Sequence, residues 1–401
     1  MKMKKIVVLA LLVVFTMVSV FASPEEVAVY RHLYNNAPSV SAQLDLLRAM
    51  AEMDLTGAGE FYAEALRRLV STYRNITNVT EKNSAAEQVI ILSDLLGAEK
   101  YTPAASDLWL ISEVCKDDNQ PVARASALMA LGRIRATTYL PHVVRVLNDL
   151  NLQPTSDRLA GERVAFGAII ALEKYQDPSG YIPVFLASEG WYTNRIRDQA
   201  RRSLPLIADD PIPFLIQMIR GTQYGLPVKL AALRNVEASD ADNASKANVA
   251  VEALAEGWRV GSGGNQQTRT TATNMRMLAL SMLQKYKVES EAAVYASIHR
   301  SFSEASASND ERLSAVRALG FQGTDEAARR LSGYLNDLNT RNVRSGGRLT
   351  NDETTRLRAI IDALGQTGNS NGRAALTAIS TGNYTPAIQR QARDALGRIG
   401  N

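Results

Sequence analysis

The sequence is poor in the residues that most often carry chemistry, with one cysteine, Cys115, and three histidines in 401 residues. A single cysteine excludes an intramolecular disulfide, so the fold must rest on its hydrophobic core. His32, His142 and His299 each stand alone in a predicted helix, without a second ligand at the spacing of a zinc site. The motifs of serine hydrolases, zinc proteases and phosphate-binding loops are missing as well. These absences argue against an enzyme, and we expect neither a cofactor nor a bound metal.

The chain begins like a bacterial signal peptide. Lys2, Lys4 and Lys5 precede an apolar run that reaches Phe21, and the small residue Ala22 follows it. We expect cleavage after Ala22 and export to the periplasm or out of the cell. The alternative is an uncleaved anchor, although an apolar run of about 17 residues is short for a bilayer span of roughly 20. No cysteine follows the run directly, which excludes a lipoprotein anchor.

The excess of basic residues lies largely in this segment. Residues 1–22 hold three of the 45 basic residues and none of the 41 acidic ones, so cleavage would leave 42 basic against 41 acidic residues. A nearly neutral chain lacks the positive field that attracts nucleic acid or an anionic membrane surface. Nucleic acid is therefore a disfavoured partner, and we expect no stable membrane span after cleavage.

Internal repeats organise the rest of the chain. The clearest unit has an apolar stripe along residues 121–134, which contain Ala130-Leu131-Gly132, and a second stripe along 139–147. Each stripe predicts a helix, and neither helix can bury its stripe without neighbours. Alanine permits the close approach of helices, and we expect Gly132 to end the first helix. Related copies lie at 85–97, 162–175, 196–207, 228–236, 312–335 and 357–379, with a half-unit at 388–399.

These copies predict an all-α fold built as a repeat array. We expect about nine helical pairs in residues 83–401, because a single globular core rarely grows to this length. An N-terminal helical cap is predicted at 23–82, and its clearest helices are 40–53 and 60–73.

The stretch from Asp118 to Arg124, followed by Ala130-Leu131-Gly132, resembles HEAT repeats, in particular the short HEAT-like class named after phycobilisome lyases. The resemblance is strong in about a third of the chain, at 118–147, 310–335 and 356–399. It implies a right-handed α-solenoid of the armadillo-like type and, most often, protein binding or scaffolding. It brings no catalytic residues to this sequence.

Insertions separate some of the repeats, at 257–274 and 339–355, with a shorter one at 151–157. We expect loops that follow the second helix of one pair and therefore share one edge of the array. The two longer insertions combine Ser-Gly-Gly with arginine, whose forked donors suit carboxylate or phosphate recognition. The alternative is that loops at repeat junctions become rich in glycine, serine and asparagine by drift. The arginines predicted to bind a partner here are Arg269, Arg344 and Arg348.

Two of the three tryptophans follow a glycine at the predicted end of a second helix, in Gly190-Trp191-Tyr192 and Gly257-Trp258-Arg259. This places them on the same edge, and exposed tryptophan, tyrosine and arginine are common at binding hot spots. We therefore predict that Trp191, Tyr192, Trp258 and Arg259 contribute to partner binding. The alternative is that each indole folds back over a helix end. Trp109 and Cys115 share an apolar helical stripe and are predicted to lie in the core.

The sequence favours an exported, non-enzymatic scaffold or adaptor that binds a protein partner through a solenoid face and the insertion edge. One alternative is a cell-wall or polysaccharide-binding module, because tryptophan and tyrosine beside asparagine and arginine can stack on and hydrogen-bond sugars. The other is a lyase-like enzyme, because HEAT-like arrays occur in bilin lyases. A deep pocket with converging titratable groups would favour the enzyme.

Overall fold

The computed structural model describes residues 24–53, 57–152, 154–261, 264–288 and 292–399. These residues form twenty α-helices, α2 to α21, and no strand, so the fold is all-α as predicted. Among the described helices, none is long and apolar enough to cross a membrane. The predicted signal peptide lies outside the described residues.

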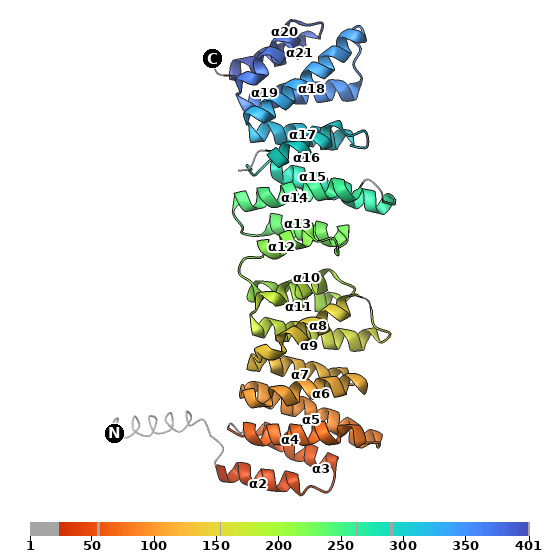
Figure 1. Cartoon of the computed structure of the whole chain (residues 1–401), viewed down its shortest axis with the longest axis vertical. Coiled ribbons are helices and arrows are strands. Elements are labelled where there is room, and N and C mark those ends of the chain that lie inside the picture. The colour runs from red at the N-terminus through yellow and green to blue at the C-terminus, as the bar shows by residue number, and fades with distance from the viewer. Residues whose placement is uncertain (1–23, 54–56, 153, 262–263, 289–291, 400–401) are drawn as a thin grey trace, which may run out of the picture. The chain divides into compact units, whose positions relative to one another are not determined.

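The chain divides into two compact units, 1–209 and 210–401. The helices predicted within the N-terminal cap correspond to α3 and α4 of unit 1 (Figure 1). The described helices of unit 1 are α2 (Pro24–Asn35), α3 (Val40–Glu52), α4 (Gly59–Thr72), α5 (Val79–Ala98), α6 (Ala105–Asp117), α7 (Pro121–Ile134), α8 (Leu140–Leu152), α9 (Arg158–Tyr175), α10 (Tyr181–Glu189) and α11 (Asn194–Ile207).

Unit 2 has the same alternation of a first, odd-numbered helix and a second, even-numbered helix (Figure 1). Its described helices are α12 (Ile212–Arg220), α13 (Leu226–Ala238), α14 (Asn243–Gly261), α15 (Gln266–Leu283), α16 (Ala292–Ser303), α17 (Asn309–Gln322), α18 (Asp325–Arg344), α19 (Asn351–Thr367), α20 (Arg373–Thr381) and α21 (Pro386–Arg398).

Successive pairs stack on one another within each unit. In unit 1 the first helices α5, α7 and α9 pack in that order, and the second helix α8 packs on α10. In unit 2 the first helices α13, α15, α17, α19 and α21 form one row, and the second helices α12, α14, α16, α18 and α20 form another. Each unit is therefore an α-solenoid, with the helical-pair architecture expected of HEAT-like repeats.

The glycine that recurs in the repeat pattern serves a purpose other than the predicted one. Gly132 was expected to end its helix, but α7 continues to Ile134. A Cβ on Gly132 would lie 2.5 Å from the Cα of Ala171 on α9. Gly167 of α9 has the same relation to Ala125 of α7, at 2.7 Å from its Cα. The glycines are needed because α7 and α9 approach each other backbone to backbone, a contact that helical periodicity alone does not reveal.

Both longer insertions are mostly helical, which corrects the expectation of loops. The first insertion extends α14 to Gly261, and α15 begins at Gln266, after Asn265 accepts a hydrogen bond from the Thr268 amide. The second extends α18 to Arg344, and α19 begins after a capping box at Thr350. The helices continue because each hairpin packs on itself, α14 along α15 and α18 along α19.

The edge predicted from the insertions is present within unit 2. The α14–α15 and α18–α19 hairpins point their tips to the same side of the unit (Figure 1). Helices therefore carry most of the inserted residues at this edge.

Candidate functional site

The tryptophan corner of unit 1 closes the end of a neighbouring helix. Trp191 is half-buried, and its Nε1 donates a hydrogen bond to the Leu150 carbonyl near the end of α8 (2.8 Å). The Arg158 guanidinium lies 5.5 Å from the indole centroid. Tyr192 is 2% exposed, and its hydroxyl donates to Oδ1 of Asn151 (2.9 Å). The prediction of Tyr192 as an exposed binding residue is wrong, because the corner satisfies polar groups at the end of α8.

The same corner recurs in unit 2 without a tryptophan. Gly382-Asn383-Tyr384 follows α20, and the Tyr384 hydroxyl donates to Oδ1 of Asn339 on α18 (3.0 Å). Nδ2 of Asn342, also on α18, donates a hydrogen bond to the Asn383 carbonyl (3.0 Å). Both units use Gly-x-Tyr-Thr in the same way, so the motif has a structural role. The repetition of this motif in the sequence could have indicated that role, but each tryptophan corner was interpreted separately.

Trp258 lies inside α14 and is 4% exposed. Its Nε1 donates to Oγ of Ser301 on α16 (2.9 Å), and the guanidinium carbons of Arg276 and Arg300 lie 3.9 Å and 5.2 Å from its ring centroid. Cations above an indole face are held by its quadrupole. The prediction of Trp258 as an exposed anchor is wrong, because α14 continues through the glycine that was expected to end it and carries the indole between helices.

Charged groups are buried around this tryptophan. Arg276 holds the Glu311 carboxylate through Nε (2.6 Å) and Nη2 (3.1 Å), and their side chains are 6% and 0% exposed. Lys229 pairs with Glu256, which Arg259 also contacts through Nε (2.6 Å) and Nη2 (2.7 Å). Burial alone would raise the pKa of Glu256, but the hydrogen bonds from Arg259 and Lys229 outweigh it and lower that pKa. Arg259 is itself exposed, but both of these hydrogen bonds go to the buried Glu256 carboxylate.

All four predicted arginines are exposed, and three of them, Arg269, Arg344 and Arg348, form no ion pair among the described residues. Arg269 lies in the first turn of α15, where its Nη2 donates to Oε1 of Gln266 (3.3 Å). Arg344 ends α18, and Arg348 follows in the turn before α19. Of the predicted binding set, these three arginines and Arg259 are exposed and Trp191 is half-buried, whereas Tyr192 and Trp258 are buried.

A hollow of about 390 Å³ lies beside the turn between α18 and α19, and we call it the Gly-Gly hollow. Gly346 and Gly347 line it in the left-handed conformation, at φ 68° and 89°, where glycine is favoured. Asn342 and Tyr384 line it as well, and its lining residues are uncharged. Arg344 and Arg348 flank the two glycines in the sequence, so the turn combines an uncharged depression with exposed guanidinium groups.

A smaller cavity of about 160 Å³ in unit 1 includes Cys115 and Arg124 in its lining. The Arg124 Nε is buried and has no hydrogen-bond partner in the described part of the chain. Cys115 is fully buried as predicted, and burial together with the nearby Asp118 carboxylate raises its pKa to about 12. A thiol that stays protonated at neutral pH is a poor nucleophile.

Two of the three histidines, His142 and His299, pack against aromatic rings. His142 on α8 lies 4.8 Å from Trp109 on α6, centroid to centroid, and Tyr139, in the turn just before α8, completes this half-buried cluster. Trp109 is half-buried, so the prediction that it lies in the core is wrong. His299 contacts the Tyr334 hydroxyl through Nδ1 (2.7 Å). Over the described ranges, no group of three or more His, Cys, Asp or Glu residues is placed to hold a metal ion.

Comparisons with known proteins add little to this picture. No protein-family model and no curated protein matches the chain. Among solved structures, human deoxyhypusine hydroxylase in complex with glycerol is similar at a TM-score of 0.27 and 14% identity, over 84% of this chain and 96% of that one. An engineered protein matches at 0.32 and 12%, over 92% and 98% of the two chains. Kap121p matches at 0.32 and 12%, over 98% of this chain and 46% of Kap121p. These TM-scores are too low to support an argument about the fold, which rests on the helices of this chain itself.

Proposed function

We propose that this protein is an exported, non-enzymatic scaffold that binds a protein partner at the edge of unit 2. The observation that carries the proposal is the turn between α18 and α19, where Arg344 and Arg348 are exposed on either side of Gly346-Gly347 beside the Gly-Gly hollow. Exposed guanidinium groups can bind carboxylates in pairs of hydrogen bonds, and the hollow can receive an uncharged segment between them.

Two further observations support a binding role rather than catalysis. The titratable groups that converge in unit 2, around Arg276, Glu311 and Glu256, are buried and satisfied by one another. Cys115 is a protonated, buried thiol. The tryptophans that suggested sugar stacking are unsuited to it, since Trp258 is buried and Trp191 is held against α8.

Export is part of the proposal and rests on the sequence of residues 1–22. Its consequence is a nearly neutral mature chain, in which local arginines rather than the net charge select the partner.

The test is affinity capture from an envelope extract with the tagged mature chain and with the double variant Arg344→Glu/Arg348→Glu. We expect a protein captured by the natural chain to lose about tenfold or more in affinity for the variant, because charge reversal removes two charge-assisted contacts and adds repulsion. The control Arg317→Glu/Arg358→Glu reverses two exposed arginines on α17 and α19 outside this turn and should bind normally.

Equal capture by both double variants, or capture of polysaccharide instead of protein, would overturn the proposed site. Intact mass of the untagged protein recovered from the envelope tests export: an N-terminus at Ser23 supports it, and retention of Met1 contradicts cleavage.

A further inference from the structure

A second depression lies in unit 1, at the ends of the first helices α5, α7 and α9. It measures about 480 Å³, and we call it the basic hollow. Four of its six lining residues are cations, namely Lys100, Arg133, Arg135 and Lys174, and the others are Gly97 and Ile134. Lys100 lies two residues after the end of α5, Arg135 directly follows α7, and Lys174 lies in the last turn of α9. Stacking therefore collects cations from three separate repeats at one place.

The backbone at two of these cations is one that glycine would normally occupy. Lys100 and Arg135 have φ 52° and 56°, in the left-handed region. Each is the third residue after the Leu-Gly of its repeat. In unit 2 the third residue after Leu-Gly is Gly323 in one repeat and Gly368 in another, at φ 69° and 63°.

Comparison of the two units shows that lysine or arginine is less favourable than glycine at these helix ends. A side chain in this conformation is less favourable than glycine. Unit 2 ends two first helices with glycine, so the helix end itself has no need of lysine or arginine. Backbone strain of this kind gathers at functional sites, where the side chain is required for another reason.

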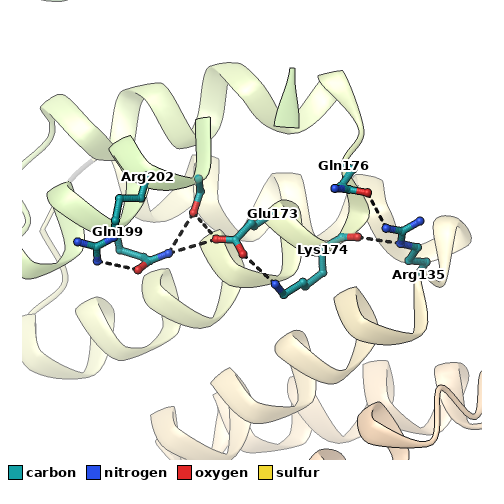
Figure 2. A network of polar contacts seen from close by, with 7 residues as sticks. Arg135, Glu173, Lys174, Gln176, Gln199 and Arg202 are labelled. Atoms are coloured by element: carbon teal, nitrogen blue, oxygen red, sulfur yellow. Dashed lines mark hydrogen bonds and ion pairs between the residues drawn. The ribbon is translucent and has the colours of Figure 1, made fainter. Parts of the chain in front are cut away.

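Internal contacts account for only part of the positive charge. Arg133 pairs with Asp94 (3.0 Å), and Lys174 pairs with Glu173 (2.9 Å), in partly exposed pairs of small energetic value. Figure 2 shows the contacts continuing from Glu173 to Gln199 and Arg202 on α11.

Of the four cations that line the basic hollow, Arg135 and Lys100 have no carboxylate partner among the described residues. Arg135 donates through Nε to the Lys174 carbonyl (3.1 Å), which caps the end of α9, and it also contacts Gln176 (Figure 2). Lys100 is exposed, and its ammonium forms no ion pair among the described residues. Helix capping thus explains one contact of Arg135 and leaves Lys100 without a structural purpose.

We propose that the basic hollow binds an acidic peptide segment, with Lys100 and Arg135 as the main carboxylate contacts. The proposal rests on the proposed function only in that the segment belongs to a protein partner. Cations spread over three helix ends and interrupted by Asp94 and Glu173 match separate carboxylates better than the closely spaced phosphates of a nucleic acid. A membrane surface is disfavoured because Ile134, the one large apolar lining residue, is 7% exposed.

Fluorescence anisotropy of a labelled glutamate-rich peptide, titrated with the full chain, tests the proposal. We expect Lys100→Gly to weaken peptide binding about tenfold, the loss of one charge-assisted contact. The same variant should raise the thermal unfolding midpoint, because glycine relieves the left-handed strain. Lys100→Gln keeps the strain and loses the charge, so it should weaken binding without the gain in stability. The control Arg145→Gln removes an exposed cation on α8 and should leave both properties unchanged.

The proposal is overturned if Lys100→Gly and Lys100→Gln bind the peptide as the natural chain does, or if the glutamine counterpart of the peptide binds equally well. Binding of a DNA oligonucleotide or of phosphatidylglycerol vesicles that depends on Lys100, without peptide binding, would also overturn it. Loss of partner capture through Arg344 and Arg348 is a separate result, because the peptide assay needs neither residue.

Discussion

Arg276 and Glu311 show what a buried charge requires at the scale of single residues. The carboxylate is fully buried on α17, and the fork of the guanidinium supplies two of its hydrogen bonds. The same guanidinium donates to the Gly257 carbonyl (3.2 Å) and covers the ring of Trp258. One side chain therefore links α14, α15 and α17. A buried pair of this kind adds little stability over apolar residues, but removing one partner leaves an unpaired charge.

We predict that Arg276→Met lowers the free energy of unfolding of unit 2 by about 3–5 kcal/mol, because Glu311 is left buried without its cation. The double variant Arg276→Met/Glu311→Leu should recover most of this loss. The measurement is urea unfolding followed by the emission of Trp258 in a chain with Trp109→Phe and Trp191→Phe. A single variant within about 1 kcal/mol of the natural chain would contradict the prediction, and the double variant separates lost charge pairing from lost packing.

At the scale of helices, close packing sets the requirement for glycine. Glycine inside a helix is normally unfavourable relative to alanine by about 1 kcal/mol. Gly132 and Gly167 are kept because α7 and α9 meet there at backbone distance. Gly333 of α18 is also helical, but a Cβ there would meet nothing within 4 Å. The same substitution should therefore have opposite effects in the two settings.

We expect Gly132→Ala to lower the thermal unfolding midpoint, because its Cβ would lie 2.6 Å from the Ala171 carbonyl oxygen and the backbone cannot move aside cheaply. Overpacking of this kind costs about 1–3 kcal/mol. Gly333→Ala should raise the midpoint slightly, by relieving the helical cost of glycine. Circular dichroism of both variants measures the difference, and a stabilised Gly132→Ala would show that α7 and α9 are less tightly packed than described.

At the scale of the whole molecule, the unfolding of each of the two units can be monitored separately. In a repeat array each pair contacts only its neighbours, so a local change spreads over a limited distance. Unit 1 contains the single cysteine, Cys115, and unit 2 contains one tryptophan, Trp258. Both are buried, so each reports the opening of its own unit.

We predict that Cys115 resists thiol reagents at pH 8 in the folded chain and reacts only when unit 1 opens, because its pKa is raised to about 12 by burial and by Asp118. An unfolded cysteine titrates near about 8.5, so the stability contributed by the buried thiol is present below that pH and is lost as the pH rises towards 12. The measurement is the labelling rate across a urea series.

The same experiment with Arg276→Met should move the Trp258 transition to lower urea and leave the midpoint of Cys115 labelling nearly unchanged. Equal shifts of the two midpoints would mean that the units unfold together, and rapid labelling without urea would show that Cys115 is accessible in the folded chain.

Local patterns in the sequence determined the helices and their order. The stripes at 121–134 and 139–147 correspond to α7 and α8, and the N-terminal helices at 40–53 and 60–73 correspond to α3 and α4. These predictions succeeded because helical periodicity and capping depend on residues within a turn or two of one another. The prediction of a loop at 257–274 failed because it relied on the glycine content of this segment. In the structure most of the segment is helical, because α14 packs along α15.

The tertiary structure alone decided which candidate residues face outwards. The buried Trp258 donates a hydrogen bond to Ser301, and Trp191 donates one to the Leu150 carbonyl. Each of these partners lies about one repeat away in the sequence. The basic hollow arises in the same way, since Lys100, Arg135 and Lys174 meet only when the repeats stack. The sequence by itself specified an array of helical pairs, because that depends on local periodicity. The exposure of each side chain depends on the neighbouring repeat, and only the packed structure brings that neighbour into place.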